Sequence, residues 1–239
     1  MANMIPKTIH YIWFGGKPLT PLANKCVASW EKYCPDYRIV RWDESNFNVN
    51  MNRYCREAYE AKKWAFASDY ARLWLLVNEG GFYLDTDVEL LRPLDRFLDL
   101  QAFSGFEADN KVAAGIMGSC RRHPIFMELL KGYDARSFVD SNGQFDITTI
   151  VEVITKLCSD SGAVLDNTEQ TINGFSLFPS DYFYPKSWNS KELHMTENTY
   201  AIHHYRGSWI TPQQRFHSKL EAILGKDTMS SIKQLLGRS

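Results

Sequence analysis

Two aspartates, Asp85 and Asp87, flank a single threonine directly after the apolar run Phe82-Tyr-Leu84. In extended backbone, side chains two residues apart point to the same side, so both carboxylates can face one cation. Such a cation keeps other coordination positions for water and a diphosphate. Because open α/β sheets bind ligands at the carboxyl ends of their strands, the pair predicts a metal site there. A turn that carries two aspartates without a ligand is the alternative.

A second candidate pair, Asp69 and Arg72, lies three residues apart on a predicted helix. Small side chains surround the pair and would let a ligand approach the helix closely; they belong to Ala65, Ala67, Ser68 and Ala71. Arginine can then donate two hydrogen bonds to a sugar hydroxyl or a phosphate. The alternative is a surface ion pair worth about 0.2–0.5 kcal/mol.

A polar and aromatic cluster near the carboxyl terminus contains His203, His204, Ser208 and Trp209. An imidazole nitrogen can complete the coordination of a borderline ion such as Mn²⁺. Ser208 and Trp209 are candidates for contact with a diphosphate. Adjacent strand residues face opposite ways, so at most one of the two histidines is a ligand. Without a ligand, one histidine would be buried and the other exposed.

Two glycine-rich sites have a structural and a functional interpretation. Trp13 stands at the end of a predicted strand, beside two glycines, where a nucleotide base could stack on it or where it could simply belong to the core. Gly115 and Gly118 indicate either a close backbone approach or a β-bulge.

The elements that must position these residues follow from the apolar pattern. A β-branched and aromatic run over 8–14 ends in a glycine turn, and a helical segment over 20–33 leads to a strand over 37–42. A unit of this size favours a parallel sheet. Residues 53–78 show apolar side chains at helical spacing, which predicts one long helix ended by two glycines.

The rest of the chain predicts an α/β fold with a mixed, mostly parallel central sheet flanked by helices. Further strands are expected at 82–84, 88–91, 102–107, 112–119, 174–178 and 199–205. Further helices are expected at 124–133 and 146–158. We expect a single domain over 1–210 and amphipathic C-terminal helices over 211–239, packed on the domain or on a membrane.

Composition narrows the class of protein. The chain has 239 residues, of which 44% are hydrophobic and 23% are charged, with 27 basic and 28 acidic side chains. These values are typical of one globular domain and argue against a dedicated nucleic-acid binder, because no excess positive charge is present for a phosphate backbone. The five cysteines form no Cys-x-x-Cys pair and the first residues form no apolar signal core. We therefore expect reduced thiols and a cytoplasmic protein.

Several motifs in a fixed order resemble a known family of sugar transferases. They are Ile5-Pro-Lys-Thr-Ile-His-Tyr-Ile-Trp-Phe-Gly-Gly16, Ser29-Trp30, Ala67-Ser-Asp-Tyr-Ala-Arg72, Gly80-Gly-Phe-Tyr-Leu-Asp-Thr-Asp87 and His204-Tyr-x-Gly-Ser-Trp209. The chain resembles, from residue 5 to about 210, the DXD-containing glycosyltransferase family of bacterial capsular and O-antigen sugar transferases and fungal initiating α-mannosyltransferases. It is also similar to the catalytic domain of the large glucosylating toxins, which share the strand tryptophan, the Asp-x-x-Arg and the Asp-x-Asp.

The resemblance implies a GT-A fold, a single nucleotide-binding α/β domain that uses a nucleotide-sugar donor and a divalent cation, Mn²⁺ or Mg²⁺. It implies that Trp13 stacks on the base and that Asp69 and Arg72 bind the hydroxyls of the donor sugar. Asp85 would contact ribose, sugar or metal, and Asp87 would be the principal metal ligand. We expect these four charged residues to be the catalytic ones.

The resemblance also assigns roles to the C-terminal cluster. His204 would be a further metal ligand, and Ser208 and Trp209 would hold the diphosphate. The toxins carry an acidic residue in the region of the histidines, which leaves His203 as the alternative to His204.

The resemblance further implies a reaction and its partners. Transfer would retain the anomeric configuration through same-face attack, with the β-phosphate helping to take the acceptor's proton. The likeness to the bacterial and toxin members favours UDP over GDP, with a hexose or an N-acetylhexosamine as the transferred sugar. The expected acceptor is a lipid-linked oligosaccharide at the cytoplasmic face of the inner membrane. Basic residues beside an apolar stripe in 216–238 fit either packing on the domain or peripheral membrane contact.

Two other classes of protein compete with a transferase. Phe82-Tyr-Leu-Asp-Thr-Asp-Val88 also fits the nucleophile strand of haloacid-dehalogenase-like phosphatases, in which Asp85 would be phosphorylated. That class needs a later acidic pair for Mg²⁺, and no adjacent Asp-Asp follows residue 87. A non-catalytic module that binds sugar nucleotides or glycans is the other alternative.

Overall fold

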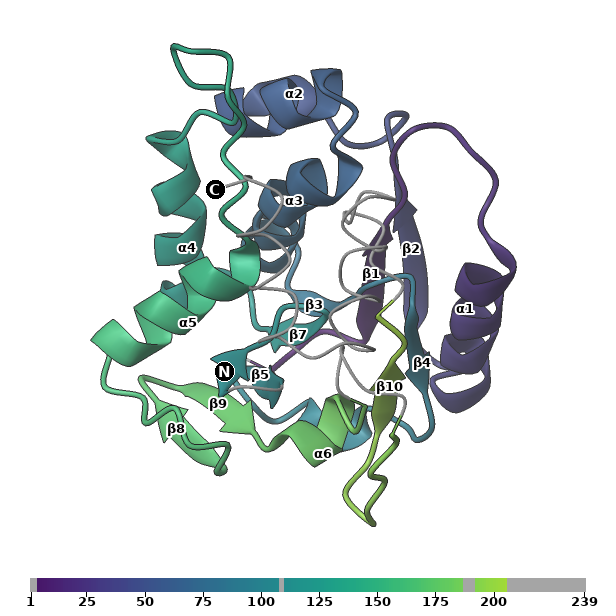
Figure 1. The fold of residues 1–239 in the computed structure, drawn as a ribbon. Helices are drawn as coiled ribbons and strands as arrows, with labels where there is room; N and C mark the ends of the chain where they lie inside the picture. The colour runs from purple at the N-terminus through teal and green to yellow at the C-terminus, as the bar shows by residue number, and fades with distance from the viewer. Residues whose placement is uncertain (1–3, 108–109, 187–191, 206–239) are drawn as a thin grey trace, which may run out of the picture. The chain divides into compact units, whose positions relative to one another are not determined.

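The fold is an α/β arrangement, seen in a computed structural model that describes residues 4–107, 110–186 and 192–205 (Figure 1). The helices are α1 (Pro21–Tyr33), α2 (Arg53–Glu60), α3 (Trp64–Asn78), α4 (Pro124–Asp134), α5 (Ile150–Asp160) and α6 (Ser180–Phe183), with short 3₁₀ helices η1 (Val49–Met51) and η2 (Asp95–Phe97). The strands are β1 (Thr8–Ile12), β2 (Arg38–Trp42), β3 (Gly81–Leu84), β4 (Val88–Leu90), β5 (Ala102–Glu107), β6 (Lys111–Val112), β7 (Ile116–Ser119), β8 (Gln170–Ile172), β9 (Phe175–Phe178) and β10 (Ala201–His203).

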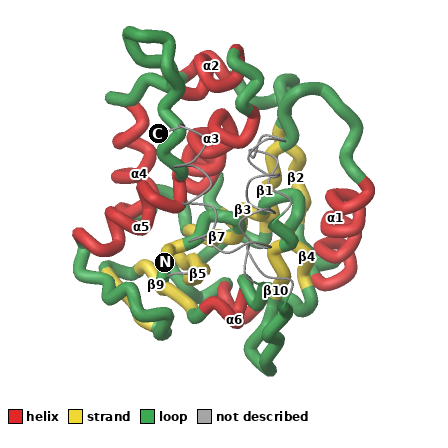
Figure 2. Tube along the Cα trace, in the orientation of Figure 1, coloured by secondary structure: helices red, strands yellow, loops and turns green. Residues whose placement is uncertain are grey.

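A central sheet with the strand order β2-β1-β3-β7-β5-β9-β8 forms the middle layer (Figure 2). Strands β2, β1, β3, β5 and β9 run in one direction, and β7 and β8 run against them. The predicted mixed, mostly parallel sheet is thereby confirmed. Strands β4 and β10 form a separate antiparallel pair.

Each face of the sheet is covered by its own apolar core. Helices α2 to α5 pack on one face and α1 and α6 on the other (Figure 1). Strand alternation sends neighbouring side chains to opposite cores, as Phe82 and Tyr83 on β3 show. Both faces of β3 are therefore buried, and the strand is fixed at the centre of the molecule.

The predicted long helix over 53–78 is wrong, because the chain breaks between α2 and α3. Lys62 has φ +58°, the left-handed conformation that ends many helices. Its N–H donates to Tyr59 O at 2.9 Å, and the N–H of Lys63 reaches back to Ala58 O at 2.9 Å. These two bonds form a Schellman motif, which redirects the chain before α3 begins.

Two further expectations need correction. The strand expected over 112–119 is interrupted at 113–115, where the chain passes from β6 to β7. The helix expected from residue 146 begins instead at Ile150, because Thr149 and Glu152 form a capping box before it.

The part of the chain after residue 205 lies outside the described residues. This includes the expected helical segment over 211–239 and the candidates Ser208 and Trp209, so the boundary near 210 stays a prediction. Within the described ranges, the helices are all too short or too polar to cross a membrane.

Candidate active site

Asp85, Thr86 and Asp87 link the carboxyl end of β3 to β4, at the center of the fold. The N–H of Asp85 donates to Gly115 O at 2.8 Å, which ties the link to the start of β7. The N–H of Val88 donates to Asp85 O at 2.9 Å and closes the turn. The sheet therefore fixes the backbone that carries both carboxylates.

Side chains of helix α1 bind the backbone of β4, the strand that follows this turn. The indole N–H of Trp30 donates to Val88 O at 2.8 Å, and the Ser29 hydroxyl accepts from the N–H of Leu90 at 2.9 Å. Both bonds end on the backbone of β4. The Ser29-Trp30 motif thus acts in this chain by positioning the strand that follows the aspartates.

Strand β10 brings a histidine to the aspartates by pairing with β4, so that His203 lies opposite Val88. The Nε2 atom of His203 lies 3.1 Å from Asp87 Oδ1. One ligand atom from each of Asp85, Asp87 and His203 falls within 4.8 Å of the others. Two carboxylates and one imidazole form a donor set suited to Mn²⁺ or Mg²⁺.

The expectation that His204 faces the aspartates disagrees with this geometry. His204 points away from them, and its Nε2 atom lies 2.8 Å from Glu89 Oε2. The reason is strand alternation, which gives His203 and His204 opposite faces once the register of β10 is set. His203 takes the place that the sequence analysis gave to its neighbour.

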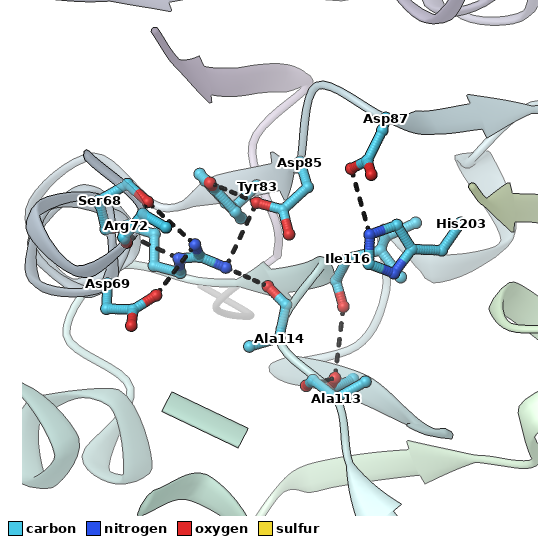
Figure 3. Close-up of polar contacts among 12 residues, drawn as sticks. Ser68, Asp69, Arg72, Tyr83, Asp85, Asp87, Ala113, Ala114, Ile116 and His203 are labelled. Atoms are coloured by element: carbon cyan, nitrogen blue, oxygen red, sulfur yellow. Dashed lines mark hydrogen bonds and ion pairs between the residues drawn. The ribbon is translucent and has the colours of Figure 1, made fainter. Parts of the chain in front are cut away.

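Arg72 lies between Asp69 and Asp85 (Figure 3). Its Nη2 is 3.0 Å from Asp69 Oδ1, and its Nη1 is 3.3 Å from Asp85 Oδ1. Nη1 also donates to Ala114 O at 3.0 Å. The Asp69–Arg72 pair is buried, so the alternative of a surface ion pair is excluded.

Two residues to which the sequence analysis gave no polar contact in the site complete this arrangement. Tyr83 donates its phenolic hydrogen to Asp85 Oδ1 at 2.7 Å, and its ring lies under the Arg72 guanidinium at 4.7 Å. Ser68 accepts from Arg72 Nη2 at 3.1 Å. The signal for Tyr83 was available, because a residue two before Asp85 on a strand points to the same side.

Burial dominates the electrostatics of these groups. It raises the pKa of Asp69 to about 7, against the lowering effect of Arg72. Burial lowers the pKa of Arg72, but Asp85, Tyr83 and Asp69 outweigh it and leave the pKa raised. Likewise, burial lowers the pKa of His203, but Asp87, Asp85 and Glu107 together outweigh it and leave the pKa raised.

Gly115 leaves room for the carboxylate and the imidazole. A Cβ atom built on it would lie 3.2 Å from Asp85 Oδ2 and 3.2 Å from His203 Cε1. Of the two interpretations of this glycine, the structure shows the close approach.

Hydrogen bonds fix the loop that follows the carboxyl end of β1. Trp13 is half-buried and donates its indole N–H to Lys17 O at 2.6 Å. Glu44 Oε1 accepts from the N–H of Gly15 at 2.6 Å and from the Tyr59 hydroxyl at 2.9 Å. A partly exposed tryptophan on a fixed loop is consistent with stacking on a base.

Glu107 and Tyr205 lie beside His203, and no sequence pattern indicated either residue. The Tyr205 ring lies 4.2 Å from the His203 ring, and its hydroxyl donates to Glu107 Oε2 at 3.5 Å. Burial raises the pKa of the Glu107 carboxyl. These residues come from distant parts of the chain and meet only in the fold.

Comparison with known proteins identifies the class of enzyme. Residues 21–104, which hold the Asp69–Arg72 pair and both aspartates of the turn, match the glycosyltransferase sugar-binding region containing a DXD motif. Over this region the chain is similar to the DXD glycosyltransferases. This similarity favours a glycosyltransferase over the haloacid-dehalogenase-like phosphatases.

Relatives of this glycosyltransferase come from a virus and from yeasts. The chain is 29% identical over 218 residues to an uncharacterized glycosyltransferase of Acanthamoeba polyphaga mimivirus, covering 86% of this chain and 84% of that protein. It is 32% identical over 153 residues to a mannosyl phosphorylinositol ceramide synthase of Saccharomyces cerevisiae, covering 57% of this chain and 37% of the yeast protein. The match therefore spans well under half of the yeast enzyme.

The fold of this glycosyltransferase also matches a solved structure. The PaToxG glycosyltransferase superposes with a TM-score of 0.52 at 19% identity, covering 66% of this chain and 70% of that one. The likeness supports the GT-A fold that the sequence analysis expected.

Proposed function

We propose that this protein is a metal-dependent, retaining glycosyltransferase that moves a hexose or an N-acetylhexosamine from a nucleotide sugar to a glycan acceptor. The observation that carries the proposal is the convergence of Asp85, Asp87 and His203 within 4.8 Å at the end of β3. The buried Asp69–Arg72 pair stands directly beside this group. A non-catalytic binding module would not need this concentration of charge.

The three converging side chains fit a divalent cation, because each offers an oxygen or an imidazole nitrogen at one point. We assign Asp87 and His203 as ligands, with Asp85 as a third ligand or a contact to ribose or sugar. A bound Mn²⁺ or Mg²⁺ supplies neutralisation of the charge that develops on the diphosphate leaving group.

The protein's own side chains would orient the donor for transfer. Asp69 and Arg72 would hold the hydroxyls of the donor sugar, and Trp13 would stack on the base. Arg72 is already held by Ser68 and Ala114, so it presents its charge at little further cost in conformational entropy. Ser208 and Trp209, outside the described residues, would contact the diphosphate. Same-face attack needs no carboxylate nucleophile from the protein.

The proposal also specifies the donor and the acceptor. We favour a UDP-sugar donor and a lipid-linked oligosaccharide acceptor in bacterial capsule or O-antigen synthesis at the cytoplasmic face of the inner membrane. The yeast relative is named as a mannosyl phosphorylinositol ceramide synthase, so GDP-mannose belongs among the donors tested. Peripheral contact of the C-terminal segment with the membrane is tested by vesicle flotation with and without residues 211–239.

Nucleotide release from a panel of UDP- and GDP-sugars tests the proposal, because slow hydrolysis of the donor needs no acceptor. We expect release from one donor in Mn²⁺ or Mg²⁺ and none in EDTA. Replacing Asp87→Asn should lower the rate at least 100-fold, since it weakens binding of the cation that neutralises the diphosphate leaving group. Asp99→Asn is the matched control, because Asp99 is exposed and is not one of the site residues.

The outcomes separate the two classes of protein. Metal-dependent release that Asp87→Asn abolishes and Asp99→Asn leaves unchanged supports the transferase. Donor binding with no release from any donor, in any metal, would instead support the sugar-nucleotide binding module.

A further inference from the structure

A second group of buried polar side chains lies on and just after α2 and α4, the helices that pack against α3, which carries Asp69. Tyr54 on α2 and Tyr133 on α4 are fully buried, with ring centroids 4.9 Å apart. The guanidinium of Arg136, just after α4, lies 4.8 Å from the Tyr54 ring and 4.6 Å from the Tyr133 ring. We call these three residues the tyrosine–arginine wall.

Each residue of the wall has an unused hydrogen-bond donor. The Tyr54 hydroxyl, the Tyr133 hydroxyl and Arg136 Nη1 are all buried and have no hydrogen-bond partner among the described residues. The other nitrogens of Arg136 are occupied, since Nε and Nη2 donate to Asp146 Oδ2 at 3.1 and 2.7 Å. Buried polar groups normally have partners, so three vacant donors in one cluster indicate a ligand or bound water.

The wall is electrostatically coupled to Asp69. After burial, the Asp69 carboxylate is the next largest cause of the raised pKa of both phenols. The charge of Arg136 in turn lowers the pKa of Asp69, and so does the backbone N–H of Ile150 at the start of α5. Asp69 therefore faces Arg72 and also the wall.

We propose that the tyrosine–arginine wall is the specificity-determining part of the sugar subsite and binds one hydroxyl group of the transferred sugar. This inference rests on the proposed glycosyl transfer. A hydroxyl accepts hydrogen bonds through its lone pairs and donates one, so it can accept from the wall while it donates to a carboxylate such as Asp69.

The charges around the tyrosine–arginine wall favour binding of a neutral sugar hydroxyl over an anionic group. Arg136 is already paired with Asp146, and Arg72 with Asp69 and Asp85. The site therefore has no surplus positive charge for a sugar carboxylate or phosphate. A site built to bind a hydroxyl rejects the deoxy analogue strongly, because the buried donors would stay unpaired.

Tyr54→Phe and Tyr133→Phe test the wall, because each removes one oxygen and keeps the ring. Tyr37→Phe is the matched control, since Tyr37 also has a buried hydroxyl without a partner among the described residues but belongs to the core on the other face of the sheet. The first readout is binding, measured as the Kd of the nucleoside diphosphate alone and the Kd of the complete donor. The second readout is nucleotide release, measured as KM and kcat. Single-position deoxy forms of the best donor are compared with the parent sugar.

We expect the two wall variants to bind the nucleoside diphosphate as the wild type does and the complete donor about 10-fold more weakly. They should also lose most of the preference for the parent sugar over one deoxy form, while Tyr37→Phe keeps it. If the wild type releases nucleotide and both wall variants discriminate against the deoxy forms as strongly as it does, the inference alone is overturned. The wall would then hold only water. Absence of release from every donor in the wild type would overturn the proposed function and this inference with it.

Discussion

At the level of single residues, the Arg72 guanidinium joins helix α3 to the end of β3 through Asp69 and Asp85. Removing one partner of a buried ion pair costs about 3–5 kcal/mol, because an uncompensated charge remains. Arg72 also donates to the backbone of Ala114 and to Ser68. Its orientation is therefore fixed before any donor binds.

Gly115→Ala should separate metal binding from folding. The added Cβ would lie 3.2 Å from Asp85 Oδ2, which forces the carboxylate or His203 to move by a few tenths of an ångström. We expect Mn²⁺ binding, measured by electron paramagnetic resonance on the protein alone, to weaken roughly 10-fold, which corresponds to about 1.4 kcal/mol.

Gly132→Ala is the control for this change. Gly132 lies in α4 with no atom near its added Cβ, so alanine should stabilise the protein by about 0.5–1 kcal/mol and leave Mn²⁺ binding unchanged. Equal Mn²⁺ affinity in wild type and Gly115→Ala would show that the close approach does not shape the site.

Sequence reasoning found the site residues that are local to one another and missed those that are not. The pair Asp69–Arg72 is defined by spacing along one helix, and Asp85 and Asp87 by their position directly after one apolar strand. The choice between His203 and its neighbour depends on the register of β10 against β4, which the residues of β10 alone do not specify.

At the level of elements, the break between α2 and α3 offers a stability test. Lys62 adopts φ +58°, where a side chain is unfavourable and glycine is free of strain. Lys62→Gly should therefore raise the free energy of unfolding by about 1 kcal/mol, measured in urea. Glu60→Gly, inside α2, should lower it by roughly 1 kcal/mol.

A lysine at this position also explains why the sequence predicts one helix. Glycine is the usual residue in the left-handed position that ends a helix, and Lys62 carries no such signal. If Lys62→Gly destabilised the protein, the Schellman motif would not be the feature that ends α2. The Gly80 turn after α3, by contrast, was correctly predicted, because there the glycine is present at φ +66°.

His10 links β1 to β2 and to the turn before β3, and it makes the stability of the sheet depend on pH. Its Nε2 lies 2.9 Å from Gly80 O, and its Nδ1 accepts from Trp42 Nε1 at 3.0 Å, so the neutral ring satisfies both contacts. Burial lowers its pKa to about 4 from 6.5. Above pH 6.5 the folded and unfolded states are both neutral, and below it only the unfolded state gains a proton.

Stability should therefore fall between pH 6.5 and pH 4, with His10 responsible for about 3 kcal/mol of the loss. The free energy of unfolding, measured in urea at each pH, should lose this part of its pH dependence in His10→Gln. His194→Gln is the control, because His194 is exposed and its substitution should leave the slope intact. An unchanged slope in His10→Gln would assign the acid sensitivity to other groups.

At the level of the whole molecule, the sheet divides the interior into two cores that share its strands. Cys55 and Cys158 lie in the core under α2 to α5, and Cys26 and Cys34 in the core under α1. Burial raises the pKa of Cys55, Cys158 and Cys26 to about 12 and that of Cys34 to about 11. The thiols thus report on each core separately.

We expect all four thiols to react with a thiol reagent at least a thousandfold more slowly in the native protein than in urea, in line with unfolding free energies of several kcal/mol. They should become reactive together, because both cores pack on the same strands. Mass spectrometry of the labelled protein measures each site. Labelling of one pair well before the other would show that one layer opens independently.

The pairing of β10 with β4 also sets the order in which the enzyme becomes competent. His203 and Asp87 are separated by 116 positions in the chain, and the intervening segment contributes β5, β7 and β9 to the sheet. Closing so long a loop has a large entropic cost that only later contacts offset. A nascent chain that ends at residue 200 carries both aspartates but lacks His203, so the three side chains can converge only after β10 has been synthesised and has paired with β4.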